Sequence, residues 1–171
     1  GIRAGNIVFS DFTSEKLYRE GGKRGAIDPC FPSKVTVAHV HNLLYEKHKK
    51  RALNLIFFPA IGDIDAGLKG TLGAWTCPSI VPSSEVVKAC FTKEGDTFAS
   101  MGITYLNPFL NLAEPKLFER QMFDAFQPVL GLTRQENVRA IEAGFRALDQ
   151  YRSYIRGQSR LVLDMLEREN K

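Results

Sequence analysis

Short apolar runs alternate with amphipathic stretches along the first two thirds of this chain. Three runs, at residues 7–10, 53–59 and 103–106, have the length and continuous hydrophobicity typical of strands covered on both faces of a parallel sheet. We therefore predict that residues 7–10, 55–58 and 103–106 form parallel strands of one sheet with helices on both faces.

Helical patterns separate these runs. Ser14 is a suitable N-cap for a first helix, and Pro32 suits the first turn of a second, where its missing N–H costs nothing. The intervening segment 60–74 is rich in Gly and Asp and predicts a loop. Helices are predicted at residues 14–20, 32–49, 83–91 and 115–126.

The C-terminal part of the chain has a different, continuous helical pattern. Thr133 and Glu136 have the spacing of a capping box, and apolar residues follow at helical spacing almost to Lys171. Such a helix is long for a compact domain, so either Gly157 interrupts it or it leads away from the domain. We expect this tail to project or to pack against another copy of the chain.

These patterns predict an α/β fold, a Rossmann-like three-layer domain with a short parallel sheet over residues 1–130, followed by a C-terminal helical extension at 131–171. The first apolar run has no strand and crossover helix before it, and the extension keeps apolar residues at Ile155, Val162 and Leu166. We therefore expect a fragment of a longer protein, whose extension connects to a second half.

Composition places the chain among ordinary globular proteins, with 44% hydrophobic and 25% charged residues among 171. The net charge is +4, and the basic residues alternate with acidic ones along most of the chain. The exception is a basic run that comprises Lys47, Lys49, Lys50 and Arg51. At a helix end such a run is favoured by the helix dipole, so we do not expect nucleic-acid binding. With neither a long apolar run nor a signal-peptide pattern, we expect no membrane association and a cytoplasmic protein.

Two of the three cysteines, Cys30 and Cys77, share a context. Each lies beside a proline in a strand-to-helix connection, and such connections converge at one edge of a parallel sheet. Helix N-termini stabilise thiolates, which iron-sulfur clusters require, so we expect the two sulfurs within roughly 10 Å of each other. The alternative is that both are small buried residues that only pack.

Cys90 and the histidines carry weaker signals. Cys90 lies in an apolar helical stretch, which predicts a buried thiol that acts as a small hydrophobe. His39 and His41 are two residues apart and point about 200° apart on a helix, which disfavours a zinc pair. We expect one to face the core or a loop and the other to face solvent. A thiol enzyme that uses Cys30 with either histidine as base is a further interpretation.

Four short segments occur in the same order as in a known family. They are Asp-Pro-Cys-Phe-Pro-Ser-Lys at 28–34, His39-Val40-His41, the strand that ends Phe-Phe-Pro at 57–59, and Thr76-Cys77-Pro78. Over residues 10–78 the chain resembles a domain associated with CoA-substrate-specific enzyme activases, related to 2-hydroxyacyl-CoA dehydratase subunits such as those of 2-hydroxyglutaryl-CoA dehydratase. Val40 stands where that family often has glycine.

The resemblance implies an electron-transfer or activation module in anaerobic CoA-ester metabolism. Cys30 and Cys77 would then be ligands of a 4Fe-4S cluster, with Lys34, His39 and His41 in supporting positions. The implied partners are an activase ATPase or a dehydratase subunit, and the chain would be an incomplete part of a lyase or of its activator. The alternative is a non-catalytic interaction domain with structural cysteines that docks the same partners.

Overall fold

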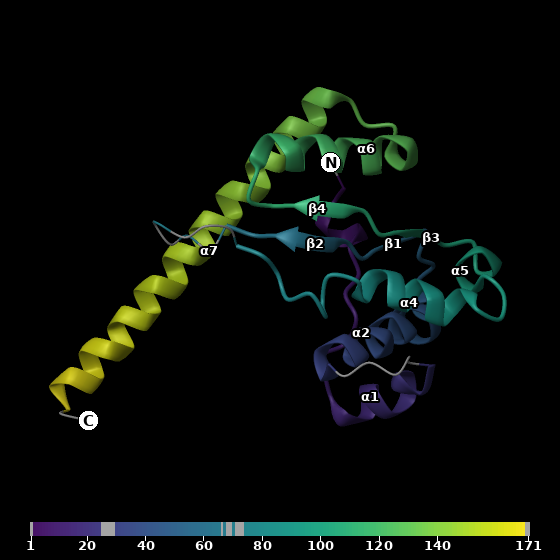
Figure 1. Ribbon diagram of the computed structural model, residues 1–171, viewed down its shortest axis with the longest axis horizontal. Coiled ribbons are helices and arrows are strands. Elements are labelled where there is room, and N and C mark those ends of the chain that lie inside the picture. The colour runs from purple at the N-terminus through teal and green to yellow at the C-terminus, as the bar shows by residue number, and fades with distance from the viewer. Residues whose placement is uncertain (1, 25–29, 66, 68–69, 71–73, 170–171) are drawn as a thin grey trace.

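The computed structural model describes residues 2–24, 30–65, 67, 70 and 74–169 (Figure 1). A narrow parallel ribbon crosses the centre of the molecule as two successive strand pairs. Strand β1 (Leu55–Phe57) pairs with β3 (Thr104–Leu106), and β2 (Ala60–Asp63) pairs with β4 (Phe109–Asn111). Backbone hydrogen bonds continue between the pairs, from the Phe58 N–H to the Leu106 carbonyl and from the Ala60 N–H to the Pro108 carbonyl, both 2.9 Å.

Proline explains why the ribbon is divided into short pairs. Pro59 separates β1 from β2, and Pro108 separates β3 from β4. A proline has no N–H to donate to a neighbouring strand, although its carbonyl still accepts, as that of Pro108 does. The apolar runs seen in the sequence therefore continue past each proline as a second strand.

Helices lie on both sides of this ribbon (Figure 1). Helices α2 and α4 cover one side, with α1 packed on the outer face of α2, whereas α6 covers the other side and leads into α7. Three short helical turns, η1, η2 and η3, complete the described elements, and η3 is a π-helical segment that continues α2. The bounds are η1 (Ala4–Asn6), α1 (Glu15–Gly21), η2 (Gly22–Arg24), α2 (Phe31–Asn42), η3 (Leu43–Lys47), α3 (His48–Lys50), α4 (Ser83–Thr92), α5 (Thr97–Ser100), α6 (Pro115–Leu130) and α7 (Arg134–Arg168).

The main core lies between α2, α4, α5 and the β1–β3 pair. Phe91 of α4 is 1% exposed and contacts Phe98 of α5 edge-on, with ring centroids 5.8 Å apart. Phe98 in turn stacks on Tyr105 of β3 at 4.4 Å. On the opposite side of the ribbon, Phe57 packs on Phe126 of α6 at 5.0 Å. The two faces of β1 are covered unequally, because Ile56 on the α2 and α4 side is buried whereas Phe57 on the α6 side stays partly exposed, so the predicted burial on both faces is only partly met.

Helix α1 begins where its sequence predicts. The Ser14 side chain accepts a hydrogen bond of 3.2 Å from the Leu17 N–H and so caps the helix. Its last residue, Gly21, faces α2 so closely that a Cβ there would stand 2.6 Å from the Cα of Ala38. A glycine at this position therefore sets the distance between the two helices.

Helix α7 is a single continuous helix of 35 residues, about 52 Å long. The predicted capping box between Thr133 and Glu136 is present, and Gly157 does not interrupt the helix. Gly131, in the left-handed conformation at φ 63°, ends α6 and lets the chain turn back. The first part of α7 packs on α6 through Phe145 and Phe118, at 5.7 Å, and the remainder projects from the domain (Figure 1).

Two predictions about the sheet were wrong. Residues 7–10 form no strand: the Ile7 N–H donates to the Ala4 carbonyl, the Ser10 hydroxyl contacts His39 of α2, and the N–H of the next residue, Asp11, donates to Asn42 of the same helix. Segment 60–74 is not wholly a loop, because it begins with β2, although part of it lies outside the described residues. The fold is thus mixed α/β with two-stranded parallel pairs and a long C-terminal helix, and a Rossmann-like sheet is not established.

Candidate functional site

Cys30 lies at the start of α2. It is the N-cap residue, is half-buried, and its carbonyl accepts a hydrogen bond of 3.1 Å from the Lys34 N–H. Pro32 occupies the first turn, as predicted. Asp28 and Pro29, which begin the recognised motif, lie outside the described residues.

Cys77 lies in a turn that is fastened to the end of β2. Its carbonyl accepts hydrogen bonds from the N–H groups of Ile80 and Val81, at 2.9 and 3.1 Å, and its side chain is exposed. The preceding Thr76 is held by the β2 backbone, because its hydroxyl donates to the carbonyls of Ile61 and Gly62. Cys77 is therefore not buried, unlike the small buried residue that the alternative interpretation expected.

A buried hydrogen bond joins the two helices that follow these cysteines. Ser33 Oγ of α2 and Ser83 Oγ of α4 lie 3.0 Å apart, and both residues are 1% exposed. Ser33 is three residues after Cys30, and Ser83 is six residues after Cys77. The first turns of the two helices are thus in direct contact, as expected for connections at one edge of a parallel sheet. The sulfur–sulfur separation itself stays a prediction.

The described residues do not complete a metal site. Over the part of the chain that the structure describes, no three side chains of His, Cys, Asp or Glu are grouped so that they would hold a metal ion. Cys90 is 5% exposed among the apolar residues of the core, which confirms the prediction of a buried, hydrophobic thiol. Cys30 and Cys77 remain the two thiols outside that core.

His39 is held between two hydroxyl groups of the N-terminal segment. Its Nδ1 lies 2.8 Å from Ser10 Oγ, and its Nε2 lies 3.0 Å from Thr13 Oγ1. A neutral imidazole donates at one of these nitrogens and accepts at the other, so both positions are used. This confirms that one of the two histidines faces a neighbouring loop, and His39 connects that loop to α2.

His41 packs on Tyr45 with ring centroids 4.6 Å apart and is half-buried, so it does not simply face solvent. Both histidines lie on the helix that Cys30 caps, nine and eleven residues beyond it. At 1.5 Å per residue they are about 13 Å or more from Cys30 along the axis, which is outside hydrogen-bond reach. The interpretation of a thiol enzyme with either histidine as base to Cys30 is therefore wrong.

The basic run at 47–51 has a role that the sequence did not reveal. Lys47 Nζ donates to Asp11 Oδ1 at 2.5 Å, and Asn42 Nδ2 donates to Asp11 Oδ2 at 3.0 Å. The hydrogen bond from Lys47, with that from Asn42, lowers the pKa of Asp11. Arg51 donates to the carbonyl of Gly5 and to the side chain of Asn6. These residues hold the N-terminal segment against the end of the α2 helix.

A comparison with known protein families matches residues 4–171 to the family described as the CoA enzyme activase uncharacterised domain. The chain belongs to this family. No curated protein and no solved structure shows significant similarity to it. Membership supports the recognised relationship to enzyme activases, whereas the relationship to dehydratase subunits remains a proposal.

No helix within the described ranges of this activase-family domain is both long and apolar enough to cross a membrane. The long α7 helix fails because charged residues recur along it, among them Arg146, Arg152 and Arg160. Some of its apolar residues, among them Ile141, Leu148 and Ile155, share one face of the helix, a pattern typical of packing against another protein surface.

His39 of this activase-family domain should titrate at lower pH than an exposed histidine. Burial lowers its pKa below the usual 6.5. The unfolded chain then binds more protons, so the stability that neutral His39 contributes above pH 6.5 is lost as the pH falls through the lower, folded-state pKa. An NMR titration of the imidazole resonances, with His39→Gln for assignment, measures this pKa. A midpoint at or above 6.5 would contradict the prediction.

Proposed function

We propose that this chain is an activation or electron-transfer module of CoA-ester metabolism in which Cys30 and Cys77 are thiolate ligands to a shared 4Fe-4S cluster. Membership of the activase-associated family supports the general role. The observation that carries the assignment to these two cysteines is the buried contact between Ser33 and Ser83, which joins the first turns of the helices that follow them. The contact supports the assignment because Cys30 lies three residues before Ser33 and Cys77 lies six residues before Ser83.

The local chemistry fits two of the four ligands that a 4Fe-4S cluster takes. Cys30 caps α2, where the helix dipole favours a negative charge, and Lys34 adds a cation one turn along the same helix. Cys77 is exposed in a turn and is accessible to a group shared with another surface. When bound, such a cluster supplies one-electron transfer. The remaining ligands would come from a partner such as an activase ATPase or a dehydratase subunit.

A docking role without a cluster has its own supporting observation. Trp75 is 84% exposed two residues before Cys77, and Phe12 is 98% exposed in the segment that binds α2. Exposed aromatic side chains of this size are typical of protein interaction sites. In this second candidate function the domain positions an activase ATPase or a dehydratase partner and carries no redox group.

Anaerobic reconstitution distinguishes the two functions. The chain is incubated with ferrous iron, sulfide and a small thiol that fills the open ligand positions, and bound iron and visible absorbance are then measured. We expect Cys30→Ser and Cys77→Ser each to bind at least about tenfold less iron than the wild type, because each removes a direct ligand.

Cys90→Ser is the matched control, because it changes the same atom at a thiol inside the core. It should retain the iron of the wild type, provided that circular dichroism shows a folded chain. Equal iron binding by the wild type and the Cys30→Ser/Cys77→Ser double variant would exclude the cluster and favour the docking function.

A further inference from the structure

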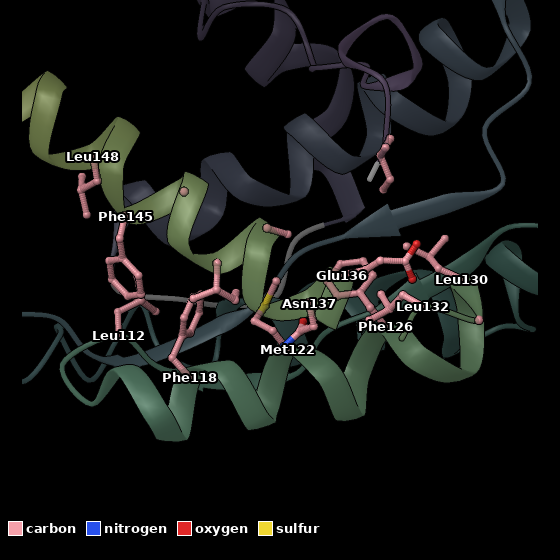
Figure 2. Close-up of a pocket in the computed structure, with 15 residues that line it drawn as sticks. Leu112, Phe118, Met122, Phe126, Leu130, Leu132, Glu136, Asn137, Phe145 and Leu148 are labelled. Carbon is pink, nitrogen blue, oxygen red and sulfur yellow. The ribbon is translucent and has the colours of Figure 1, made fainter. Parts of the chain in front are cut away.

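An apolar cavity of about 650 Å³ lies between α6 and the first half of α7 (Figure 2). Its walls come from both helices and from the end of β4, and Figure 2 shows Phe118, Met122 and Phe145 directed into the space between them. Ala140 and Gly144 also line it, and nothing lies within 4 Å of the position of a Cβ on Gly144. The small residues leave room for another helix to approach α7 closely.

The apolar face that lines this cavity continues along the uncovered half of α7. Apolar residues recur every seven positions at Ile141, Leu148, Ile155 and Val162. Ile141 and Leu148 line the cavity, where α6 packs alongside. Ile155 and Val162 are 42% and 55% exposed, since α6 does not extend that far. The same face therefore passes from a partly filled groove to open surface.

The total exposed surface is large for a chain of this size. The accessible area is 11935 Å², whereas a compact monomer of 19.2 kDa exposes about 8400 Å². The excess of about 3500 Å² exceeds the roughly 800 Å² that each partner buries in a standard protein interface. The second half of α7, which projects from the domain, contributes to this exposed surface (Figure 1).

We propose that two copies of this chain form an antiparallel dimer along α7, in which Val162 and Leu166 of each copy cover the α6–α7 cavity of the other. In this register Val162 lies opposite Phe145 of the second copy, and Leu166 lies opposite Ile141 of the second copy. Both of these facing residues line the cavity. Leu166 is 41% exposed in the isolated chain and gains a cover in the dimer. The assembly is a four-helix arrangement of α6 and α7 from each copy.

Charge complementarity selects the antiparallel orientation. The same register places Asp149 near Arg156 of the second copy at the edge of the seam, offset by two positions from the directly facing pairs, and the two-fold symmetry repeats this pair. A parallel dimer would instead place Arg152 against Arg152 of the second copy within the apolar seam. In the antiparallel dimer Arg152 meets Ile155 instead, and its guanidinium is already turned aside to donate to the Asp65 carbonyl at 3.0 Å.

The first test is the mass of the full chain by size-exclusion chromatography with light scattering, under reducing conditions because Cys77 is exposed. The wild type should show twice the 19.2-kDa chain mass. Val162→Glu should raise the dimer dissociation constant at least about tenfold, because it places a carboxylate in the apolar cavity. Leu161→Glu is the matched control, since Leu161 is 57% exposed and lies about 100° around the helix.

The orientation is tested by charge exchange. Asp149→Arg should weaken the dimer by facing Arg156 of the second copy, and the double variant Asp149→Arg/Arg156→Asp should restore it. A wild type that stays monomeric, equal effects of Val162→Glu and Leu161→Glu, or an Asp149→Arg variant that dimerises normally would each overturn the proposal. A monomeric wild type would mean that a partner other than a second copy covers the cavity. Iron binding at Cys30 and Cys77 is measured separately, so either proposal can fail alone.

Discussion

Replacing Phe91 with alanine is expected to lower the free energy of unfolding by about 3–5 kcal/mol, the cost of a large cavity in a closed core. Phe91 is 1% exposed and belongs to the buried cluster that joins α2, α4, α5 and β1. Its ring also contacts Phe98 of α5, which stacks on Tyr105 of β3. Removing the Phe91 ring therefore also weakens the packing of α5 and β3. Urea denaturation followed by circular dichroism measures the difference.

Phe12→Ala provides the matched control, because the same atoms are removed from a side chain that is 98% exposed. Its effect should stay within about 0.5 kcal/mol. Phe91→Leu keeps much of the buried volume and should cost less than Phe91→Ala, which keeps the comparison informative if the alanine variant does not fold. Equal effects at positions 12 and 91 would show that the described core is wrong.

Gly21→Ala is expected to cost about 1–3 kcal/mol, the usual range for forcing an extra methyl group into a packed contact. The new Cβ would lie 2.6 Å from the Cα of Ala38 and 3.0 Å from its carbonyl oxygen. Both atoms belong to the α2 backbone, which cannot turn aside as a side chain can. Helix α1 must therefore move away from α2, which opens the contact between them.

The control for this variant is Gly157→Ala in α7, where nothing lies within 4 Å of the added Cβ. Alanine within a helix interior is favoured over glycine by about 0.5–1 kcal/mol, so Gly157→Ala should stabilise the chain slightly. The two substitutions should change the unfolding midpoint in opposite directions. A shift of the same sign at both glycines would show that packing on Ala38 does not decide the effect at Gly21.

Some features of the candidate site could be predicted from the sequence because each depends on only a few consecutive residues. Cys30 before Pro32 marked the start of a helix, and the apolar neighbours of Cys90 marked a core position, as the structure confirms. The partners of His39 could not be predicted in this way. Its contacts with Ser10 and Thr13 join residues 29 and 26 positions apart, and nothing local in either segment specifies the other.

Local structure was determined by the sequence itself wherever the deciding interactions are short in range. The Ser14 cap, the Thr133–Glu136 capping box and the apolar run of β1 each involve only a few neighbouring residues. Both caps and the strand were correctly predicted. Extended backbone is different, because a strand exists only where another strand accepts its hydrogen bonds.

Tertiary structure alone decided which extended segments became strands and which surfaces met. Residues 7–10 have a strand-like sequence, but Ser10 contacts His39 of α2, and the next residue, Asp11, binds Lys47 of η3, which lies 36 positions further along the chain. The buried contact of Ser33 with Ser83 spans 50 positions and joins the first turns of α2 and α4. Such contacts depend on how whole helices pack, because each gains its energy only after distant segments have been brought together.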